Sequence, residues 1–331
     1  MPRLLHPLLA ADIGGTHCRI AIVDAPGAAP RTVMRLSTKD EPSCEAALAR
    51  AITGAGTVPR SAILAVAGPV IGLGAELTNA GWALHGPSLM AALGLEQGLL
   101  LNDFEALACC LPVLGAADLT AIGDGVAAPA ADGARLVLGP GTGFGAAALG
   151  GRAGRYTIVP TEAGHMELGP ALPDELALWP LLERVHGRIT VESVLSGAGL
   201  ARLDLALRHL AGADLTRRDA AGIAAAAFAG KATALAAVRL FGRLLGRVAG
   251  DLALALKATG GVFLAGGITP KLLPLFDHGE VRSAFATKPP MQALMADARL
   301  SVVTGPDPAE RGLALVALDP AAFGLETRLW A

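Results

Sequence analysis

Residues 101–108 read LNDFEALA, and this stretch decides the fold that we expect for the whole chain. Three apolar residues, 99–101, lead into Asn102 and Asp103, and Phe104 begins a helical pattern. An apolar strand that ends in polar side chains just before a helix is a common place for chemistry in α/β proteins. We therefore expect Asp103 to be a general base that takes a proton from a hydroxyl group. The alternative is that Asp103 only caps the helix.

The composition limits the class of protein. The 331 residues allow one large domain or two lobes, and 53% of them are hydrophobic, yet no uncharged apolar run is long enough to span a bilayer. The formal net charge of −2, without a basic block, argues against a nucleic-acid surface. The four cysteines form no CxxC pair, so the sequence indicates neither a zinc ribbon nor a disulfide framework. The cysteines are Cys18, Cys44, Cys109 and Cys110. We expect a cytoplasmic protein that binds neither nucleic acid nor membrane.

The first fifteen residues, MPRLLHPLLAADIGG, resemble a short signal peptide. His6 and Pro7 interrupt the apolar run, however, and Asp12 follows it at once. We interpret residues 8–13 as a first buried strand.

A tight turn, Gly14–Thr16, follows that strand, and residues 18–23 alternate as a second strand. This pattern predicts a hairpin, which is neither a P-loop nor a Rossmann fingerprint. Glycines here let backbone N–H groups approach an anion, and Asp12 is placed to hold a water-bound Mg²⁺ beside phosphates. An ordinary glycine hairpin explains the same residues.

A second hairpin of the same kind is predicted further along the chain. Residues 135–138 form a strand that runs into GPGTGFG, 139–145, and out through residues 146–149. Thr142 is placed in this turn as Thr16 is in the first. Each hairpin opens a block of mixed α/β pattern, which indicates an internal repeat. Two such turns are suited to the β- and γ-phosphates of a nucleotide.

Other elements follow from periodicity and from helix signals. Strands are expected at 33–36, 61–67, 262–265 and 300–303, and helices after Ser43, at 88–93, at 173–185, after Ser196, twice within 215–258, and at 308–318. The first of these helices should bury Ala46, Leu48 and Ile52. Gly242, Gly246 and Gly250 recur at a spacing of four, which lets another helix approach closely, and Gly260–Gly261 should end that helix.

Four further places carry polar residues or glycines of interest. Glu162 and His165 lie three apart in a glycine-rich loop and can bind neighbouring hydroxyls, with a metal pair as the alternative. Glu192 precedes Ser196, and a solvated surface carboxylate explains it equally. Asn79 lies close to Trp82, although a loop Asn commonly bonds its own backbone. Gly266–Gly267 leaves room for a flat ring, or is a turn that needs positive φ.

Taken together, these motifs resemble the bacterial glucokinase family. DIGGTHCRIAI, LNDFEA, GPGTGFG, TEAGH, VESVLSGAGL and FLAGGI occur here in the order seen in that family, from about residue 8 to about residue 318. The resemblance implies a two-lobed α/β fold, the ribonuclease H-like (actin-like ATPase) fold, with a cleft between the lobes. The expected lobes are 1–112 plus 306–331 (small) and 113–305 (large).

The resemblance also implies an activity. Members phosphorylate D-glucose at the 6-hydroxyl with ATP and Mg²⁺, giving glucose 6-phosphate and ADP for glycolysis, and a homodimer is expected. Asp103 matches the catalytic base, and Asn102, Glu162, His165 and Glu192 match sugar ligands, to which the sequence adds Asn79. The phosphate turns match at Gly14, Gly15 and Thr16 and at Gly141, Thr142 and Gly143, and Gly266 and Gly267 fall in the adenosine segment.

This chain departs from the family pattern at two places. Thr161 and Ala163 replace glycines that often flank the glutamate, and His17 stands where Asn is usual. The cysteine-rich zinc motif of the related ROK kinases is absent, which favours the zinc-free branch. The alternatives are a kinase of N-acetylglucosamine, mannose or fructose, an actin-like filament or Hsp70-like ATPase, and a sugar-responsive repressor with an added helix-turn-helix. ADP or polyphosphate is the alternative donor.

Overall fold

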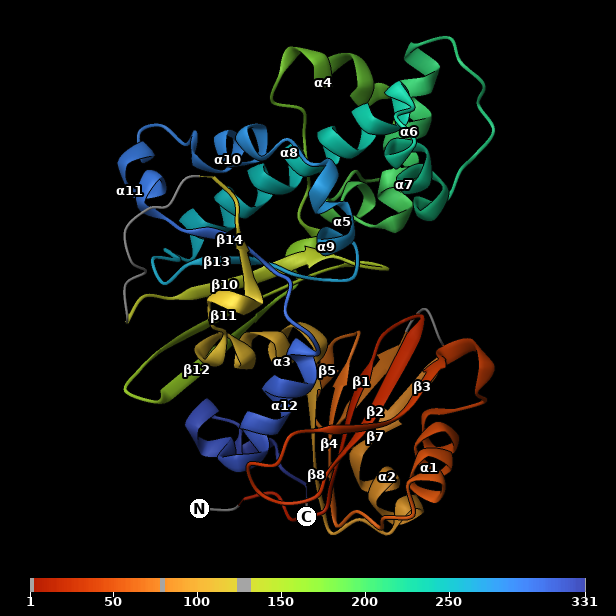
Figure 1. Ribbon diagram of the computed structural model, residues 1–331, viewed down its shortest axis with the longest axis vertical. Coiled ribbons are helices and arrows are strands. Elements are labelled where there is room, and N and C mark those ends of the chain that lie inside the picture. The colour runs from red at the N-terminus through yellow and green to blue at the C-terminus, as the bar shows by residue number, and fades with distance from the viewer. Residues whose placement is uncertain (1–2, 78–80, 124–131, 331) are drawn as a thin grey trace. The chain divides into compact units, whose positions relative to one another are not determined.

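The computed structural model describes residues 3–77, 81–123 and 132–330. Contacts between residues divide the chain into two compact units. Unit 1 comprises Met1–Gly115, Ala147–Pro160 and Gly305–Ala331, and unit 2 comprises Ala116–Ala146 and Thr161–Thr304. Each unit combines helices with β-structure (Figure 1).

Unit 1 is built on a five-stranded sheet in the order β3-β2-β1-β4-β8. Its strands are β1 (Leu8–Ile13), β2 (His17–Val23), β3 (Arg31–Ser37), β4 (Ser61–Val66) and β8 (Gln97–Asn102). The predicted first hairpin is confirmed, because β1 and β2 pair antiparallel. All six residues of β4 are buried, as expected for a strand covered on both faces.

The parallel register of this sheet brings its polar ends together. Ile13 of β1 lies opposite Val66 of β4, and Val66 lies opposite Asn102 of β8. Asp12 and the Asn102–Asp103 pair therefore leave the sheet at the same edge, the carboxyl edge where α/β proteins place their ligands.

Helices cover both faces of the sheet of unit 1. Helices α1 (Cys44–Ala55) and α2 (Gly86–Leu93) lie on one side, and α3 (Asp103–Cys110) and α12 (Pro308–Leu318) lie on the other (Figure 1). Ser43 caps α1 as predicted, with its hydroxyl accepting from the Ala46 N–H. The predicted buried face of α1 is wrong in part: Cys44, Ala47, Leu48 and Ala51 are buried, whereas Ala46 and Ile52 are half-buried. A small second sheet contains β5 (Val70–Ile71), β6 (Gly74–Leu77) and β7 (Trp82–His85).

A six-stranded sheet in the order β12-β11-β10-β13-β14-β9 carries the second glycine turn. Its strands are β9 (Leu119–Ala121), β10 (Arg135–Pro140), β11 (Phe144–Arg152), β12 (Arg155–Thr161), β13 (Val262–Leu264) and β14 (Leu300–Val303). The predicted second hairpin is confirmed by the neighbouring strands β10 and β11. The helices are α4 (Pro173–Leu178), α5 (Val191–Val194), α6 (Gly197–Leu210), α7 (Ala220–Phe228), α8 (Ala232–Ala255), α9 (Thr269–Leu272), α10 (His278–Ala286) and α11 (Gln292–Asp297).

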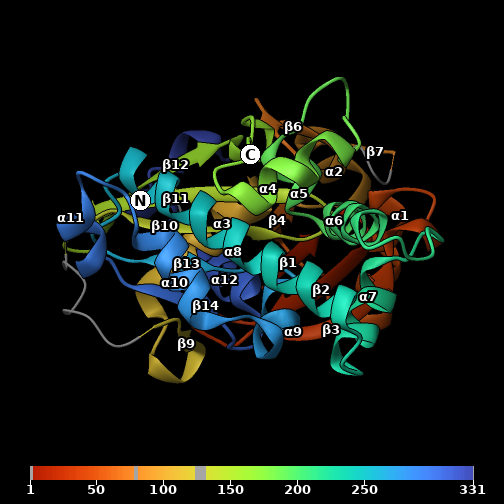
Figure 2. The same ribbon diagram turned by 90° about the horizontal axis from the view of Figure 1, so that it is seen from above.

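Helix α8 is the core helix of unit 2, and α10 lies alongside it in both views (Figure 1 and Figure 2). The predicted role of its glycines is confirmed. A Cβ on Gly246 would lie 2.3 Å from the carbonyl oxygen of Val281 on α10, and one on Gly250 would lie 2.3 Å from that of Phe285. Small residues at this spacing therefore set how closely α8 and α10 approach.

Among the described residues, no single helix has the length and hydropathy to cross a membrane. Within the same residues, α7 and α8 satisfy both criteria only when they are taken as one segment, and the two helices are bent by 112° relative to each other.

Two predicted helix ends are wrong. The helix expected over 173–185 ends at Leu178 and continues only as a 3-10 turn, Trp179–Leu181, because Pro180 has no N–H to donate to the carbonyl four residues before it. The second helix expected within 215–258 ends at Ala255, before Gly260–Gly261, and the chain turns at Lys257, whose φ is +47°.

Opposite stability effects are expected when alanine replaces two helical glycines. Gly246→Ala should destabilise the protein by about 1–3 kcal/mol, because its Cβ meets backbone rather than a flexible side chain. Gly54→Ala in α1 is the matched control, since no atom lies within 4 Å of its Cβ. It should stabilise by about 0.5–1 kcal/mol, because alanine favours the helix. Chemical denaturation measures both changes, and equal effects of the two substitutions would contradict the packing argument.

Candidate active site

The junction between β8 and α3 holds the predicted Asn102–Asp103 pair. Asn102 has extended backbone and caps α3, with its Oδ1 accepting from the Phe104 N–H at 2.9 Å. Glu105 completes a capping box, because its Oε2 accepts from the Asn102 N–H at 2.8 Å. Asp103 Oδ1 also lies 3.0 Å from the Phe104 nitrogen. Asn102 is thus the N-cap residue, and Asp103 is the first residue of the helix, with a carboxylate that also accepts from that N–H.

The side chain of Asn102 also joins this junction to the end of β4. Its Nδ2 donates to the carbonyl oxygens of Gly68 at 3.1 Å and Val66 at 3.4 Å. The amide is thus held at both ends by backbone groups, and the residue before Asp103 has a fixed position.

A charged cluster surrounds Asp12, which leaves the same sheet edge. Arg19 pairs with Asp307 at 2.7 Å and with the buried Glu310 at 2.8 Å, both at the start of α12. The pKa of Asp12 is raised to about 7, because burial disfavours its charged form and because Glu310 and Asp103 add negative charge nearby, while Arg19 acts in the opposite direction. Neither Arg19 nor Glu310 was among the residues predicted for the site. The hairpin register, which sets Arg19 opposite Asp12, is a signal that would have pointed to the arginine.

Replacing Asp12 with Asn is expected to raise the Tm of the ligand-free protein in EDTA above about pH 7. The ordinary pKa of an aspartate is 3.8, whereas the folded protein keeps this proton until about pH 7. Wild-type stability therefore falls through that window as the pH rises, whereas Asn does not titrate. The Tm of the variant should exceed that of wild type by about 2 °C or more at the upper end of this pH window and by little at its lower end.

Thermal unfolding measured across the pH range checks this expectation. The control is Asp24→Asn. The Asp24 carboxylate lies 3.6 Å from the Arg31 guanidinium, and its side chain is 54% exposed. A Tm difference between Asp12→Asn and wild type that stays constant with pH would contradict the assigned shift.

The first glycine turn is held by the residues that follow β3. The Gly14 N–H donates to the His17 carbonyl oxygen at 2.8 Å, closing the turn. The buried Thr38 donates its N–H to the Thr16 carbonyl at 3.0 Å and its hydroxyl to the Gly15 carbonyl at 3.1 Å. These bonds use the carbonyls of the turn and fix its shape beside Asp12.

The second glycine turn lies in unit 2 and is bonded to Glu192. The Phe144 N–H donates to Glu192 Oε2 at 2.8 Å, and a Cβ on Gly143 would lie 2.4 Å from the same oxygen. The Gly197 N–H donates to the Gly141 carbonyl at 3.1 Å. Glu192 is half-buried and contacts the turn directly.

The loop that carries Glu162 and His165 lies next to the same turn. A Cβ on Gly164 would lie 2.5 Å from the Phe144 carbonyl oxygen, so this glycine lets the loop pack against Phe144. Glu162 Oε2 lies 3.8 Å from His165 Nε2, and the side chains of Glu162 and His165 are 67% and 63% exposed. Within the described ranges, no group of three or more His, Cys, Asp or Glu residues is arranged to hold a metal ion.

Of the remaining candidates, Gly266 has a φ of +85°, and its Cβ position lies 2.4 Å from the Pro140 carbonyl oxygen. The positive-φ turn is therefore observed at Gly266, whereas no atom lies within 4 Å of a Cβ on Gly267. Asn79 lies outside the described residues.

The chain is similar in sequence and in fold to several known proteins. The family model described as Glucokinase matches residues 9–320. A protein of Rhizobium meliloti (strain 1021) named glucokinase is 41% identical over 328 residues, which cover 98% of this chain and 96% of the relative. The crystal structure of glucokinase from an Antarctic psychrotroph has 32% sequence identity and a TM-score of 0.80, and the match covers 95% of this chain and 99% of that chain. A ROK family glucokinase from Streptomyces griseus, solved in complex with glucose and AMPPNP, has 21% identity and a TM-score of 0.64, covering 95% of this chain and 98% of that chain.

The fold and the polar strand ends thus define a sugar kinase with the actin-like ATPase fold. The chain belongs to the glucokinase family. It is an enzyme that phosphorylates glucose with ATP. The family, fold class and activity implied by the sequence motifs are confirmed.

Proposed function

We propose that Asp103 is the general base that takes the proton from the 6-hydroxyl of D-glucose as the γ-phosphoryl group of ATP is transferred. The observation that carries this role is the junction of β8 and α3, which fixes the residue before Asp103 through four hydrogen bonds at the carboxyl edge of the sheet. A positioned carboxylate of this kind suits phosphoryl transfer, in which the protein supplies orientation and charge stabilisation.

The remaining candidates have roles in holding the two substrates. We assign Asn102, Glu162, His165 and Glu192 to the sugar hydroxyls, and also Asn79. We assign the turns at Gly14, Gly15 and Thr16 and at Gly141, Thr142 and Gly143 to the phosphates, with the N–H groups of Gly14 and Gly141 closing the two turns, and we assign Gly266 and Gly267 to the adenosine. The bond between Glu192 and the Phe144 N–H supports a direct link between the sugar ligands and the second phosphate turn.

Asp12 is the residue that fits Mg²⁺. Burial is the main reason that the pKa of Asp12 is raised, and the negative charges of Glu310 and Asp103 raise it further; a divalent cation would offset these charges. A single carboxylate suits this ion, which keeps several waters and binds substrate phosphates. Bound there, Mg²⁺ neutralises charge on the phosphates.

The experiment that tests this function compares phosphoryl donors and sugars side by side. We expect kcat/KM to be highest for glucose with ATP, compared with ADP, polyphosphate, N-acetylglucosamine, mannose and fructose. The 6-phosphate is identified by coupling to glucose 6-phosphate dehydrogenase. A higher kcat/KM for another hexose would show that glucose is not the preferred substrate. A higher kcat/KM with ADP or polyphosphate would show that ATP is not the preferred donor.

We extend the proposal to the organisation of the protein. The lobes are 1–112 plus 306–331 and 113–305, the enzyme is a homodimer in the cytoplasm, and it binds neither nucleic acid nor membrane. Four free, buried cysteines support a reducing compartment. Sedimentation equilibrium tests the dimer, and a monomer mass of 33.3 kDa at all concentrations would refute it.

A further inference from the structure

The outer edge of β8 is covered by residues 326–330, which we call the C-terminal segment. Strand β8 is the last strand of its sheet. Gly98 and Trp330 exchange two backbone hydrogen bonds of 3.0 Å, and Arg328 Nη2 donates to the Leu100 carbonyl oxygen at 3.0 Å. The segment therefore takes up backbone groups that an edge strand otherwise exposes.

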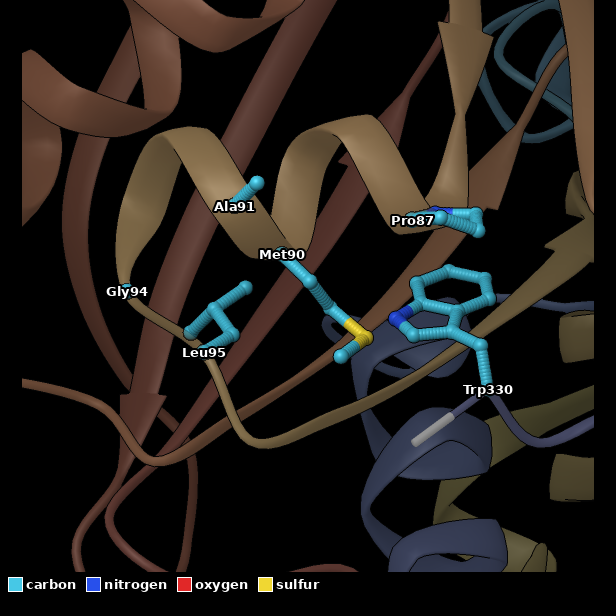
Figure 3. Close-up of a pocket in the computed structure, with 6 residues that line it drawn as sticks. All are labelled: Pro87, Met90, Ala91, Gly94, Leu95 and Trp330. Carbon is cyan, nitrogen blue, oxygen red and sulfur yellow. The ribbon is translucent and has the colours of Figure 1, made fainter.

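The indole ring of Trp330 anchors this segment. Trp330 is only 4% exposed, and it lines a shallow pocket with Pro87 and Met90 (Figure 3). Two glycines make room for the ring: a Cβ on Gly98 would lie 2.2 Å from it, and one on Gly86 would lie 2.4 Å from it. The position of the segment along β8 is therefore set by close packing as well as by hydrogen bonds.

Arg328 connects the segment to the junction that carries Asp103. Its guanidinium binds both carboxylate oxygens of Glu105, at 2.8 and 3.0 Å. Glu105 is 3% exposed, and its Oε2 also accepts from the Asn102 N–H. One continuous series of bonds therefore runs from the C-terminal segment through Glu105 to the backbone immediately before Asp103.

We propose that Glu105 and Arg328 are positioning residues that hold Asp103 in its reactive orientation through the backbone of Asn102. This inference rests on the proposed role of Asp103 as the base. A two-point arginine–carboxylate pair fixes direction as well as distance, and proton transfer depends on both. Without Arg328, the side chain of Glu105 loses the partner that orients it toward the Asn102 N–H.

The first test is Arg328→Gln, which is expected to lower kcat about tenfold while the KM for ATP stays within about twofold. The matched control is Arg60→Gln. Arg60 makes a similar two-point pair with Glu96, at 2.7 and 3.0 Å, but both side chains are exposed and they precede β4 and β8. This control should keep wild-type kcat. Wild-type kcat in folded Arg328→Gln would overturn the inference.

The second test separates positioning from a general loss of structure. In the Asp103→Asn background, adding Arg328→Gln should lower kcat no further, because the group being oriented is already absent. A further tenfold loss in the double variant would show that Arg328 acts elsewhere and would refute the proposal. If Asp103→Asn alone retains wild-type kcat, the role of Asp103 as base fails instead, which is a distinguishable result.

Two conservative variants keep the proposal testable if Arg328→Gln does not fold. Glu105→Gln keeps an oxygen that can accept from the Asn102 N–H, since glutamine also serves in capping boxes. Arg328→Lys keeps the charge but loses the two-point geometry. Each should lower kcat by less than the expected tenfold and by more than Arg60→Gln does. Wild-type kcat in both would overturn the inference.

Discussion

Replacing Asp103 with Asn is expected to lower kcat by on the order of 10²-fold or more while leaving glucose affinity largely intact. Asparagine cannot accept the proton of the hydroxyl, but it has nearly the same shape. Its side-chain oxygen can still accept from the Phe104 N–H, as Asp103 does at 3.0 Å, so the start of α3 should be preserved. The loss should therefore appear in turnover rather than in folding or sugar binding.

A coupled assay measures kcat, and calorimetry measures glucose affinity. The control variant is Asp277→Asn, which changes the N-cap of α10 in the same chemical way, since Asp277 accepts from the Glu280 N–H at 3.0 Å. Its kcat should equal that of wild type. Near wild-type turnover in Asp103→Asn would remove Asp103 from the mechanism.

The second large effect is expected at Gly143. Gly143→Ala should lower kcat/KM for both substrates by about 10²-fold, because a displacement of about 1 Å at a catalytic group has that effect. The new Cβ would lie 2.4 Å from Glu192 Oε2 and 3.1 Å from its Cδ, so the carboxylate must move. That movement removes its bond to the Phe144 N–H and displaces a proposed sugar ligand together with the second phosphate turn.

Gly150→Ala is the control for this change. Gly150 lies further along β11, where no atom is within 4 Å of its Cβ position, so kcat/KM should stay at the wild-type value. An increase in KM for ATP alone in Gly143→Ala, with unchanged glucose binding, would show that Glu192 does not link the two substrates.

Features that depend on neighbouring residues could be predicted from the sequence. The β1–β2 hairpin follows from a glycine turn between two alternating strands, and β4 follows from its continuous apolar run. Ser43 and Ser196 were predicted as helix caps because a cap bonds a backbone N–H only three residues away. These elements were sufficient to indicate a mixed α/β fold with two glycine turns.

Features that depend on distant residues could not be predicted in this way. Arg328 and Glu105 are 223 residues apart, and Arg19 and Glu310 are 291 apart, so no periodicity or spacing connects them. At the β8–α3 junction both Asn102 and Asp103 are good cap residues, and only the backbone geometry assigns the capping box to Asn102. The overlong helix after Pro173 was a different kind of error, because Pro180 was a local signal against it.

The contact between Trp330 and Gly98 also has a consequence for how the protein is made. Strand β8 leaves the ribosome more than two hundred residues before the segment that covers its edge. During synthesis, unit 2, which ends at Thr304, is complete before the last parts of unit 1 exist. A nascent chain shorter than 328 residues cannot form the bond between Arg328 and Glu105. If Arg328 orients the junction as we propose, full catalytic competence requires that synthesis has passed residue 328.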